Sequence, residues 1–266
     1  MSRIDATFAA LRERGERALV PFFMAGDPSL DVTERLIIEV ERRGADVIEL
    51  GVPFSDPIGD GPVNQRAADR ALEAGTTLVR VLETVARVRE RVRTPIVLLA
   101  YYNPIHAFGL KAFARTAAEA GVDGLLVVDL PPDEATDLAA EAATAGLDMI
   151  HMASPTSTPA RLRLIARRST GFIYVVSRMG VTGERNDVPA ELAAQVRSLR
   201  LVTTKPICVG FGIARPEQVA AVGALADGAI VGSAIVRMME ERGRSASLVD
   251  DVAGFIGELK APLRKV

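Results

Sequence analysis

Cysteine, histidine and lysine are all scarce in this chain of 266 residues, and each scarcity excludes a class of site. The single cysteine, Cys208, has no partner for an internal disulfide, which is typical of proteins from a reducing compartment. The two histidines, His106 and His151, are far apart, so a zinc or non-haem iron site would need mostly carboxylate ligands. We therefore expect no metal site, and chemistry that relies on carboxylates, hydroxyls and backbone amides.

Long apolar runs and clustered positive charge are missing as well. The longest apolar runs, around 96–102 and 124–128, are far shorter than the roughly 20 residues that span a bilayer. Lys+Arg 32 against Asp+Glu 34 gives a net charge of −2 with no basic block, which argues against nucleic acid or an anionic membrane as the main partner. The chain begins without a signal-peptide pattern and contains no P-loop string. These absences predict a soluble, cytoplasmic protein.

Short apolar, β-branched runs alternate with longer amphipathic stretches along the whole chain. The predicted strands are 19–25, 46–54, 95–102, 124–130, 148–153, 171–177, 206–212 and 228–231. Helical patterns lie between them, for example at 31–43, 77–91, 108–120, 133–145 and 190–199. Eight strands, each followed by a helix and without a linker, predict a single (β/α)8 TIM barrel over residues 1–266. An open doubly wound sheet is the alternative, but it usually has fewer strands and its dinucleotide fingerprint is missing.

The two ends of the chain predict helices beyond this repeat. Residues 4–14 carry an apolar stripe that predicts an extra helix over the bottom of the barrel, and a closing helix is expected from Ser247. Gly44, Gly121 and Gly146 are expected as left-handed residues at the ends of three helices. In such a barrel the active site lies at the C-terminal ends of the strands.

Glu49 is an acid in the middle of the apolar second strand. With a period of two, Val47, Glu49 and Gly51 share one face. Ile48 and Leu50 belong against the helices, which points Glu49 into the barrel mouth. A carboxylate there has a large desolvation cost unless it is protonated or paired. Glu49 is therefore a candidate acid–base group, and the alternative is a structural acid bonded to a neighbouring amide.

Two glycine-containing loops after strands add candidate polar groups. Asp60 is flanked by glycines, so the backbone there can place its carboxylate over the mouth. Asp56-Pro57, earlier in the same loop, has the pattern of a turn. After the sixth strand, Gly180 and Gly183 suit a mobile lid, and Gly183 offers a bare amide to an anion.

A phosphate site is predicted where the last two strands end. Gly212 follows the seventh strand, and Gly232-Ser233 follows the eighth. Ser233 is expected to cap a short helix over 234–239, whose first N–H groups would point at the mouth. Loops in these positions with a short extra helix are the usual phosphate site of this barrel, and backbone amides suffice for it. The alternative is a pair of tight glycine turns.

Taken together, these strings resemble the tryptophan synthase alpha chain family over nearly the whole chain. The strings that carry the resemblance are 21–22 with 26–28, 49–57 with 60–62, 177–183, 210–213 and 232–236. The resemblance implies a lyase that cleaves indole-3-glycerol phosphate to indole and glyceraldehyde 3-phosphate without a cofactor. The lysines agree with this, because Lys205 precedes a strand and Lys111 lies in a predicted helix, so neither is placed for a Schiff base.

The resemblance also implies roles for single residues. Glu49 would protonate indole C3, Asp60 would accept the indole N–H, and Tyr174 would support the site near Glu49. The implied substrate-binding residues are Phe22, Leu99, Leu126 and Phe211 around the indole ring, Gly183, Gly212, Gly232 and Ser233 at the phosphate, and Thr182 in the lid.

A partner is implied as well, namely a pyridoxal-phosphate-dependent beta chain in an α2β2 tetramer. Asp56, Pro57 and Asn103 are the rim residues expected to contact it. Three alternatives stay open at this point. A phosphoribosyl isomerase is disfavoured because the first strand ends at residues 23–26 without an acid. A mainly allosteric subunit and a stand-alone indole-producing lyase are the other two.

Overall fold

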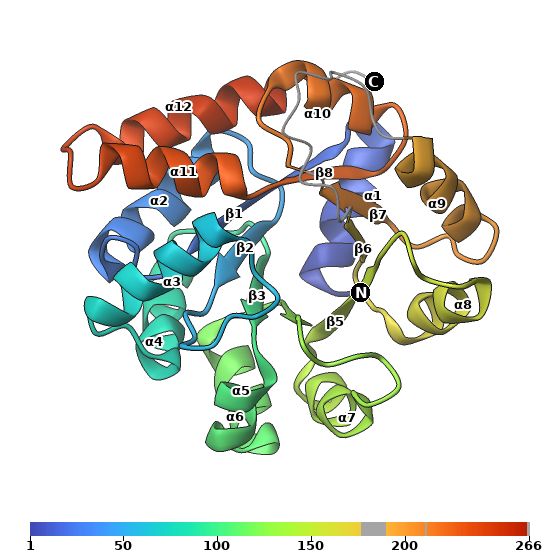
Figure 1. Cartoon of the computed structure of the whole chain (residues 1–266), viewed down its shortest axis with the longest axis horizontal. Coiled ribbons are helices and arrows are strands. Elements are labelled where there is room, and N and C mark those ends of the chain that lie inside the picture. Colours follow the sequence, from blue (N-terminus) through green and yellow to red (C-terminus); the bar gives the residue numbers. More distant parts are fainter. Residues whose placement is uncertain (177–189, 211, 265–266) are drawn as a thin grey trace.

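Eight parallel strands close into a barrel in a computed structural model that describes residues 1–176, 190–210 and 212–264. Each strand pairs with the next along the chain, and β8 closes onto β1. The strands are β1 (Ala18–Met24), β2 (Ile48–Gly51), β3 (Ile96–Ala100), β4 (Gly124–Val127), β5 (Asp148–Ala153), β6 (Ile173–Val176), β7 (Ile207–Gly210) and β8 (Gly228–Val231). The predicted (β/α)8 barrel is confirmed, and the open doubly wound sheet is wrong (Figure 1).

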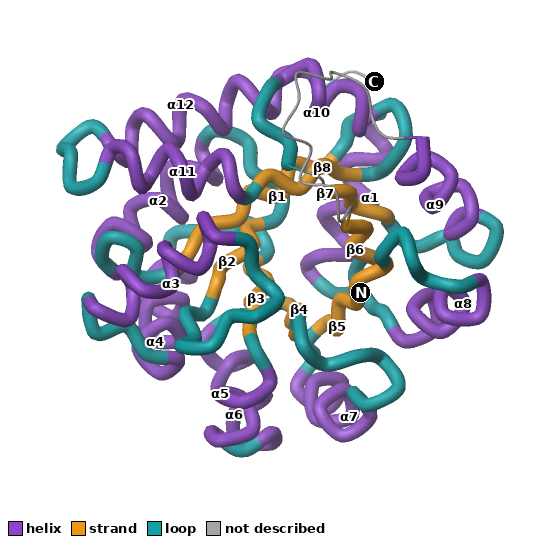
Figure 2. The backbone as a smooth tube through the Cα atoms, in the orientation of Figure 1, coloured by secondary structure: helices purple, strands orange, loops and turns teal. Residues whose placement is uncertain are grey.

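A ring of helices surrounds the strands, and Figure 2 shows this ring outside the barrel. The helices are α1 (Arg3–Arg14), α2 (Leu30–Arg42), α3 (Pro62–Glu73), α4 (Leu78–Arg89), α5 (Tyr102–Phe108), α6 (Leu110–Ala120), α7 (Thr136–Ala145), α8 (Pro159–Arg168), α9 (Ala190–Arg200), α10 (Pro216–Gly223), α11 (Ser233–Arg242) and α12 (Leu248–Lys260), followed by the 3-10 turn Ala261–Leu263. Within the described residues, none of these helices has the length and apolar character needed to cross a membrane.

Side-chain alternation along the strands divides the core into two layers. Ile48 and Leu50 of β2 lie in an outer cluster with apolar residues of the surrounding helices. Val47, just before β2, lies in an inner cluster with Val97 of β3 and Leu126 of β4. The period of two therefore places the even-numbered residues of β2 against the helices, as predicted, and leaves Glu49 on the inner side.

Helix α1 closes the lower end of the barrel, where the strands begin. Ile4, Phe8 and Leu11 of α1 are buried in the inner cluster, and the rings of Phe8 and Phe172 are 5.9 Å apart. Gly124 opens β4 at this end, and a Cβ there would lie 3.1 Å from Cδ1 of Ile4. The extra helix predicted from the apolar stripe is confirmed, and it packs directly against the barrel interior.

The ends of several elements differ from the predictions. The third strand was predicted to run to residue 102, but the chain leaves β3 at Ala100 and turns at once into α5. A proline in the first turn of α5, Pro104, is compatible with a helix because the N–H groups there have no intrahelical acceptor. Gly121 and Gly146 are the predicted left-handed C-caps. The C-cap of α2 is Arg43, and the expected Gly44 follows it with φ +98.

Candidate active site

Glu49 lies inside the barrel on β2 and is only 1% exposed. Its neighbours in register are Phe22 on β1 and Val97 on β3. Among the described residues, no group hydrogen-bonds its Oε1, which is not the environment of a structural acid held by an amide. Burial first, and the nearby charge of Asp60 second, raise the pKa of Glu49 from 4.5 to about 8. The group is therefore protonated near neutral pH and able to donate a proton.

Asp60 lies half-buried on the loop between β2 and α3, where groups from two sides hold it. Tyr101 Oη, at the end of β3, donates a hydrogen bond to Asp60 Oδ2 over 3.0 Å and accepts one from the backbone N–H of Gly59. Gln65 Nε2 of α3 donates to the backbone oxygen of Asp60 over 2.9 Å. Burial raises the pKa of Asp60, while hydrogen bonds from Tyr101 and Asn64 oppose that rise. The carboxylate is thus wetter and better bonded than Glu49.

Tyr174 on β6 brings a phenol toward the same two acids. Its side chain packs against the inner cluster, and its pKa is raised well above the ordinary value by burial and then by the charge of Glu49. A Cβ at Gly210 on β7 would lie 3.2 Å from Tyr174 Oη, so the glycine leaves room for the phenol. The phenol therefore stays protonated and can act as a hydrogen-bond donor beside the acids.

Three of the four apolar residues expected around the indole ring are in the inner cluster. Phe22, Leu99 and Leu126 are at most 9% exposed, and Leu99 and Leu126 are paired in register across β3 and β4. The ring of Phe22 fits against two glycines, because a Cβ at Gly51 or at Gly232 would lie 2.9 Å or 3.2 Å from it. These side chains give the barrel interior an apolar surface beside Glu49.

The predicted phosphate residues are at the ends of β7 and β8. Gly212 is exposed with φ +80, and the space where a Cβ would stand is open. The N-cap of α11 is Gly232 and Ser233 is its first helical residue, so the prediction that Ser233 caps the helix is wrong. No described side chain caps α11. Its first N–H groups therefore face the mouth without a side-chain acceptor, which is the usual arrangement at an anion site.

Other predicted residues are on the rim or outside the described part of the chain. Asp56 and Asn103 are exposed, and Pro57 is half-buried. The sequence reasoning missed Ile58 beside them, a large apolar side chain that is 87% exposed. The residues that fall outside the described ranges are Thr182, Gly183 and Phe211.

Tyr101 and Asn64 are the functional candidates that the sequence reasoning missed. Tyr101 is not among the predicted site residues, yet it bonds Asp60 directly. Asn64 lies in the first turn of α3, and its buried Oδ1 has no partner among the described residues. The sequence did contain a signal for each residue. Asn64 is a polar residue one turn after the candidate carboxylate Asp60, and Tyr101 is a tyrosine where the neighbouring strand ends.

The described residues do not place a metal cluster, a lysine or a reactive cysteine at the barrel mouth. No group of three or more His, Cys, Asp and Glu side chains is placed among them to hold a metal ion. Lys205 Nζ donates to the backbone oxygens of Ala166 and Ser169, at the lower end of the barrel, so it does not reach the mouth. Cys208 is fully buried within β7.

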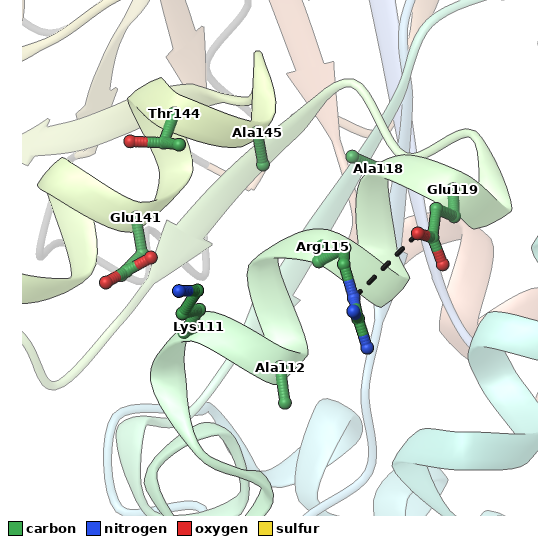
Figure 3. A pocket seen from close by; sticks show the side chains of 8 residues that line it. All are labelled: Lys111, Ala112, Arg115, Ala118, Glu119, Glu141, Thr144 and Ala145. Atoms are coloured by element: carbon green, nitrogen blue, oxygen red, sulfur yellow. Dashed lines mark ion pairs between the residues drawn. The ribbon is translucent and has the colours of Figure 1, made fainter.

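A groove of about 580 Å³ lies on the outer wall between α6 and α7, away from these residues. Figure 3 shows the side chains that line it, which are Lys111, Ala112, Arg115, Ala118, Glu119, Glu141, Thr144 and Ala145. The exposed Arg115–Glu119 pair lies one turn apart on α6. None of the predicted site residues lines this groove, so it is separate from the candidate active site.

The family model described as the tryptophan synthase alpha chain matches residues 8–263. The chain belongs to the tryptophan synthase alpha chain family. It is 52% identical over 265 residues to the alpha chain of Geobacter sp. (strain M21), covering 100% of this chain and 99% of the relative. It is also 52% identical over 260 residues to that of Geobacter sulfurreducens, covering 98% of each.

Solved structures agree with this membership of the tryptophan synthase alpha chain family. Subunit alpha of Legionella pneumophila is 36% identical, with a TM-score of 0.91 and coverage of 99% of this chain and 98% of that one. A chain from the α2β2 complex of Pyrococcus furiosus is 36% identical, with a TM-score of 0.86 and coverage of 92% and 98%. This chain is accordingly a carbon–carbon lyase for indole-3-glycerol phosphate, and the isomerase alternative is wrong.

Proposed function

We propose that Glu49 and Asp60 carry the cleavage of indole-3-glycerol phosphate, with residues 1–266 acting as one domain. The observation that carries the proposal is the contrast between the two acids. Glu49 is a buried, protonated acid with a pKa of about 8, and Asp60 is a half-buried carboxylate held by Tyr101. Two carboxyl groups in such different environments fit a division of labour between a proton donor and a stabiliser of positive charge.

The reaction needs one proton donor that also acts as a base. Glu49 donates its proton to indole C3, and the ring becomes an indolenine cation with positive charge on its nitrogen. Asp60 accepts a hydrogen bond from the indole N–H and stabilises that charge as it develops. The Glu49 carboxylate then takes the proton of the adjacent glycerol hydroxyl, and the carbon–carbon bond breaks. Its electron pair returns to the ring, giving indole and the aldehyde, and Glu49 is protonated again.

The remaining residues hold the substrate in place for these steps. Phe22, Leu99 and Leu126 offer the apolar surface for the indole ring, and Phe211 belongs to the same group by resemblance. At the phosphate, the open N-terminus of α11 supports roles for Gly212, Gly232 and Ser233. By resemblance, Gly183 joins that site and Thr182 orders Asp60 from the lid. Tyr174 positions Glu49, and the chain itself needs no cofactor.

A beta chain that carries pyridoxal phosphate is the proposed partner in a cytoplasmic α2β2 complex. The similar Pyrococcus furiosus chain comes from a study of mutual activation in such a complex. The exposed Ile58 beside Asp56 and Pro57 supports docking on this rim, because covering its side chain removes apolar area from water. Tyr101 joins this loop to the start of α5, which carries Asn103, so contact at the rim can favour an aligned Asp60.

Indole release from indole-3-glycerol phosphate, with and without a beta chain, tests both parts. We expect weak activity from the isolated chain and a large increase with the partner. Pro57→Ala and Asn103→Ala should reduce that increase more than the basal rate. Arg12→Ala, on α1 at the other end of the barrel, is the control. Full activity that no beta chain changes would instead identify a stand-alone lyase, and no indole at all would refute the proposed roles.

A further inference from the structure

Four charged side chains join three segments that lie far apart in the sequence. Arg70 of α3 binds Asp27, in the turn after β1, through two hydrogen bonds of 2.9 and 2.7 Å. The same guanidinium donates to Glu240 of α11 over 2.9 Å. Arg66, one turn earlier on α3, binds both oxygens of Glu240 at 2.7 Å. We call these four residues the α3–α11 tie.

The tie connects the two helices that begin at the active site. Helix α3 starts two residues after Asp60, and α11 starts at Ser233 in the proposed phosphate site. The two helices are in contact, and they lie side by side in Figure 1. Glu240 is seven residues beyond Ser233, which is about 10 Å along a helix. The tie therefore joins the two helices about two turns away from the proposed phosphate residues.

The geometry of the tie favours a rigid connection. Two of its three arginine–carboxylate pairs, Arg66–Glu240 and Arg70–Asp27, are bidentate, which fixes orientation as well as distance. The Asp27 side chain is 3% exposed, so its end of the tie is shielded from water. The pKa of Glu240 is lowered to about 2, mainly by the hydrogen bonds from Arg66. The pKa values of Arg66 and Arg70 are raised by the same contacts, so these three groups remain charged across the neutral pH range.

We propose that Arg66, Arg70 and Glu240 are positioning residues for the cleavage reaction. They hold α3 against α11. Binding of the substrate phosphate at the start of α11 therefore positions Asp60, which lies just before the start of α3. Binding energy from a remote, non-reacting group is in this way used at the reacting atoms. The inference rests on the proposed function, because it needs Asp60 and the phosphate residues in their proposed roles.

Glu240→Gln tests the tie with two substrates, indole-3-glycerol phosphate and indole-3-glycerol, which lacks the phosphate. We expect kcat for the phosphorylated substrate to fall about tenfold, since small displacements of an aligned group cost rate, with little change in KM. The slow cleavage of indole-3-glycerol should change much less. Arg66→Gln should act alike, and Arg66→Lys should recover part of the loss because it keeps the charge.

Asp251→Asn is the matched control. It breaks the 2.9 Å pair between Arg242 and Asp251 of α12. Arg242 lies on α11, as Glu240 does, but this pair does not involve α3, so both rates should be unchanged. Thermal unfolding of each variant reports whether it folds. Equal losses on both substrates, or a loss no larger than that of Asp251→Asn, would overturn the inference. Failure of the unaltered chain to cleave indole-3-glycerol phosphate would instead remove the proposed function itself.

Discussion

Tyr101 and Asp60 meet where two rim segments of the barrel come together. Tyr101 Oη donates to Asp60 Oδ2 over 3.0 Å and accepts from the N–H of Gly59, so one hydroxyl fixes the carboxylate and the backbone next to it. Tyr101 is 2% exposed, and burial together with the charge of Asp60 raises the pKa of its phenol far above the ordinary value. Asp60 is therefore held by a donor that does not titrate in the neutral range.

Tyr101→Phe should lower kcat for indole release by about tenfold, because Asp60 loses the bond that aligns it. The loss should be smaller than that of Asp60→Asn, which removes the charge itself. Tyr102→Phe, one residue further on, is the control, since no hydrogen bond from the Tyr102 hydroxyl is found among the described residues. Unchanged kcat in Tyr101→Phe would show that the bond is not needed for catalysis.

Glu49→Gln should reduce turnover by about 10²–10⁴-fold or more, because the amide cannot shuttle a proton and one group serves two steps. The variant keeps the size of the side chain, so the fold and the binding of glyceraldehyde 3-phosphate should be retained. Steady-state indole release and calorimetric binding measure the two effects. Near-normal turnover by the folded variant would refute the assignment.

Burial of Glu49 also predicts a dependence of stability on pH. The group ionises near 4.5 when the chain is unfolded and near 8 when it is folded, so between these values the folded chain holds one more proton. The free energy of unfolding should therefore fall as pH rises through this window, by up to about 1.4 kcal/mol per pH unit. Glu49→Gln should remove that part of the slope and be more stable than the unaltered chain near pH 8.

Urea denaturation across this pH window measures the slope. Other acids with raised pKa values, such as Asp46 and Asp123, contribute to both proteins, so the difference between them isolates Glu49. Glu258→Gln, an exposed change on α12, is the control. Identical slopes in Glu49→Gln and the unaltered chain would mean that Glu49 is ionised in the folded state near neutral pH.

Ser233→Asp should weaken binding of glyceraldehyde 3-phosphate by about tenfold, or about 1.4 kcal/mol, because it puts a like charge beside the phosphate. An acid at a helix N-terminus favours the helix, so the variant should fold at least as well as the unaltered chain. Ser233→Ala is the neutral control, and indole-3-propanol is the ligand without a phosphate. Equal weakening of both ligands would place the phosphate elsewhere.

The sequence was sufficient for features that depend on local periodicity. The alternation around Glu49 predicted which residues of β2 face inward, and the alternation of apolar runs with amphipathic stretches predicted eight strands. The Tyr101–Asp60 bond was not predictable in this way, because it joins loops 41 residues apart and depends on how the rim folds. The bond between Arg70 and Glu240 spans 170 residues, and no local pattern contains it.

Local errors had local causes. Ser233 has the usual chemistry of an N-cap, but Gly232 occupies that place with φ −118 and ψ −78, so the helix starts one residue early. Helix α5 was missed because its residues follow an apolar strand without a turn signal between them. The predicted strands were too long at the mouth for the same reason. Buried apolar residues such as Val52 and Leu130 continue past the ends of β2 and β4, and they pack in the outer cluster.

Helix α1 determines through which end of the barrel substrate and products can pass. Ile4, Phe8 and Leu11 plug the lower end with side chains that are at most 4% exposed, so an indole ring has no passage downward. Substrate must enter, and both products must leave, through the upper opening. The order of product release then matters, because an aldehyde product held at the proposed phosphate site on α11 would border the opening that indole uses. A partner that receives indole directly therefore has to bind at this opening, because a partner bound elsewhere on the barrel would not meet the released indole.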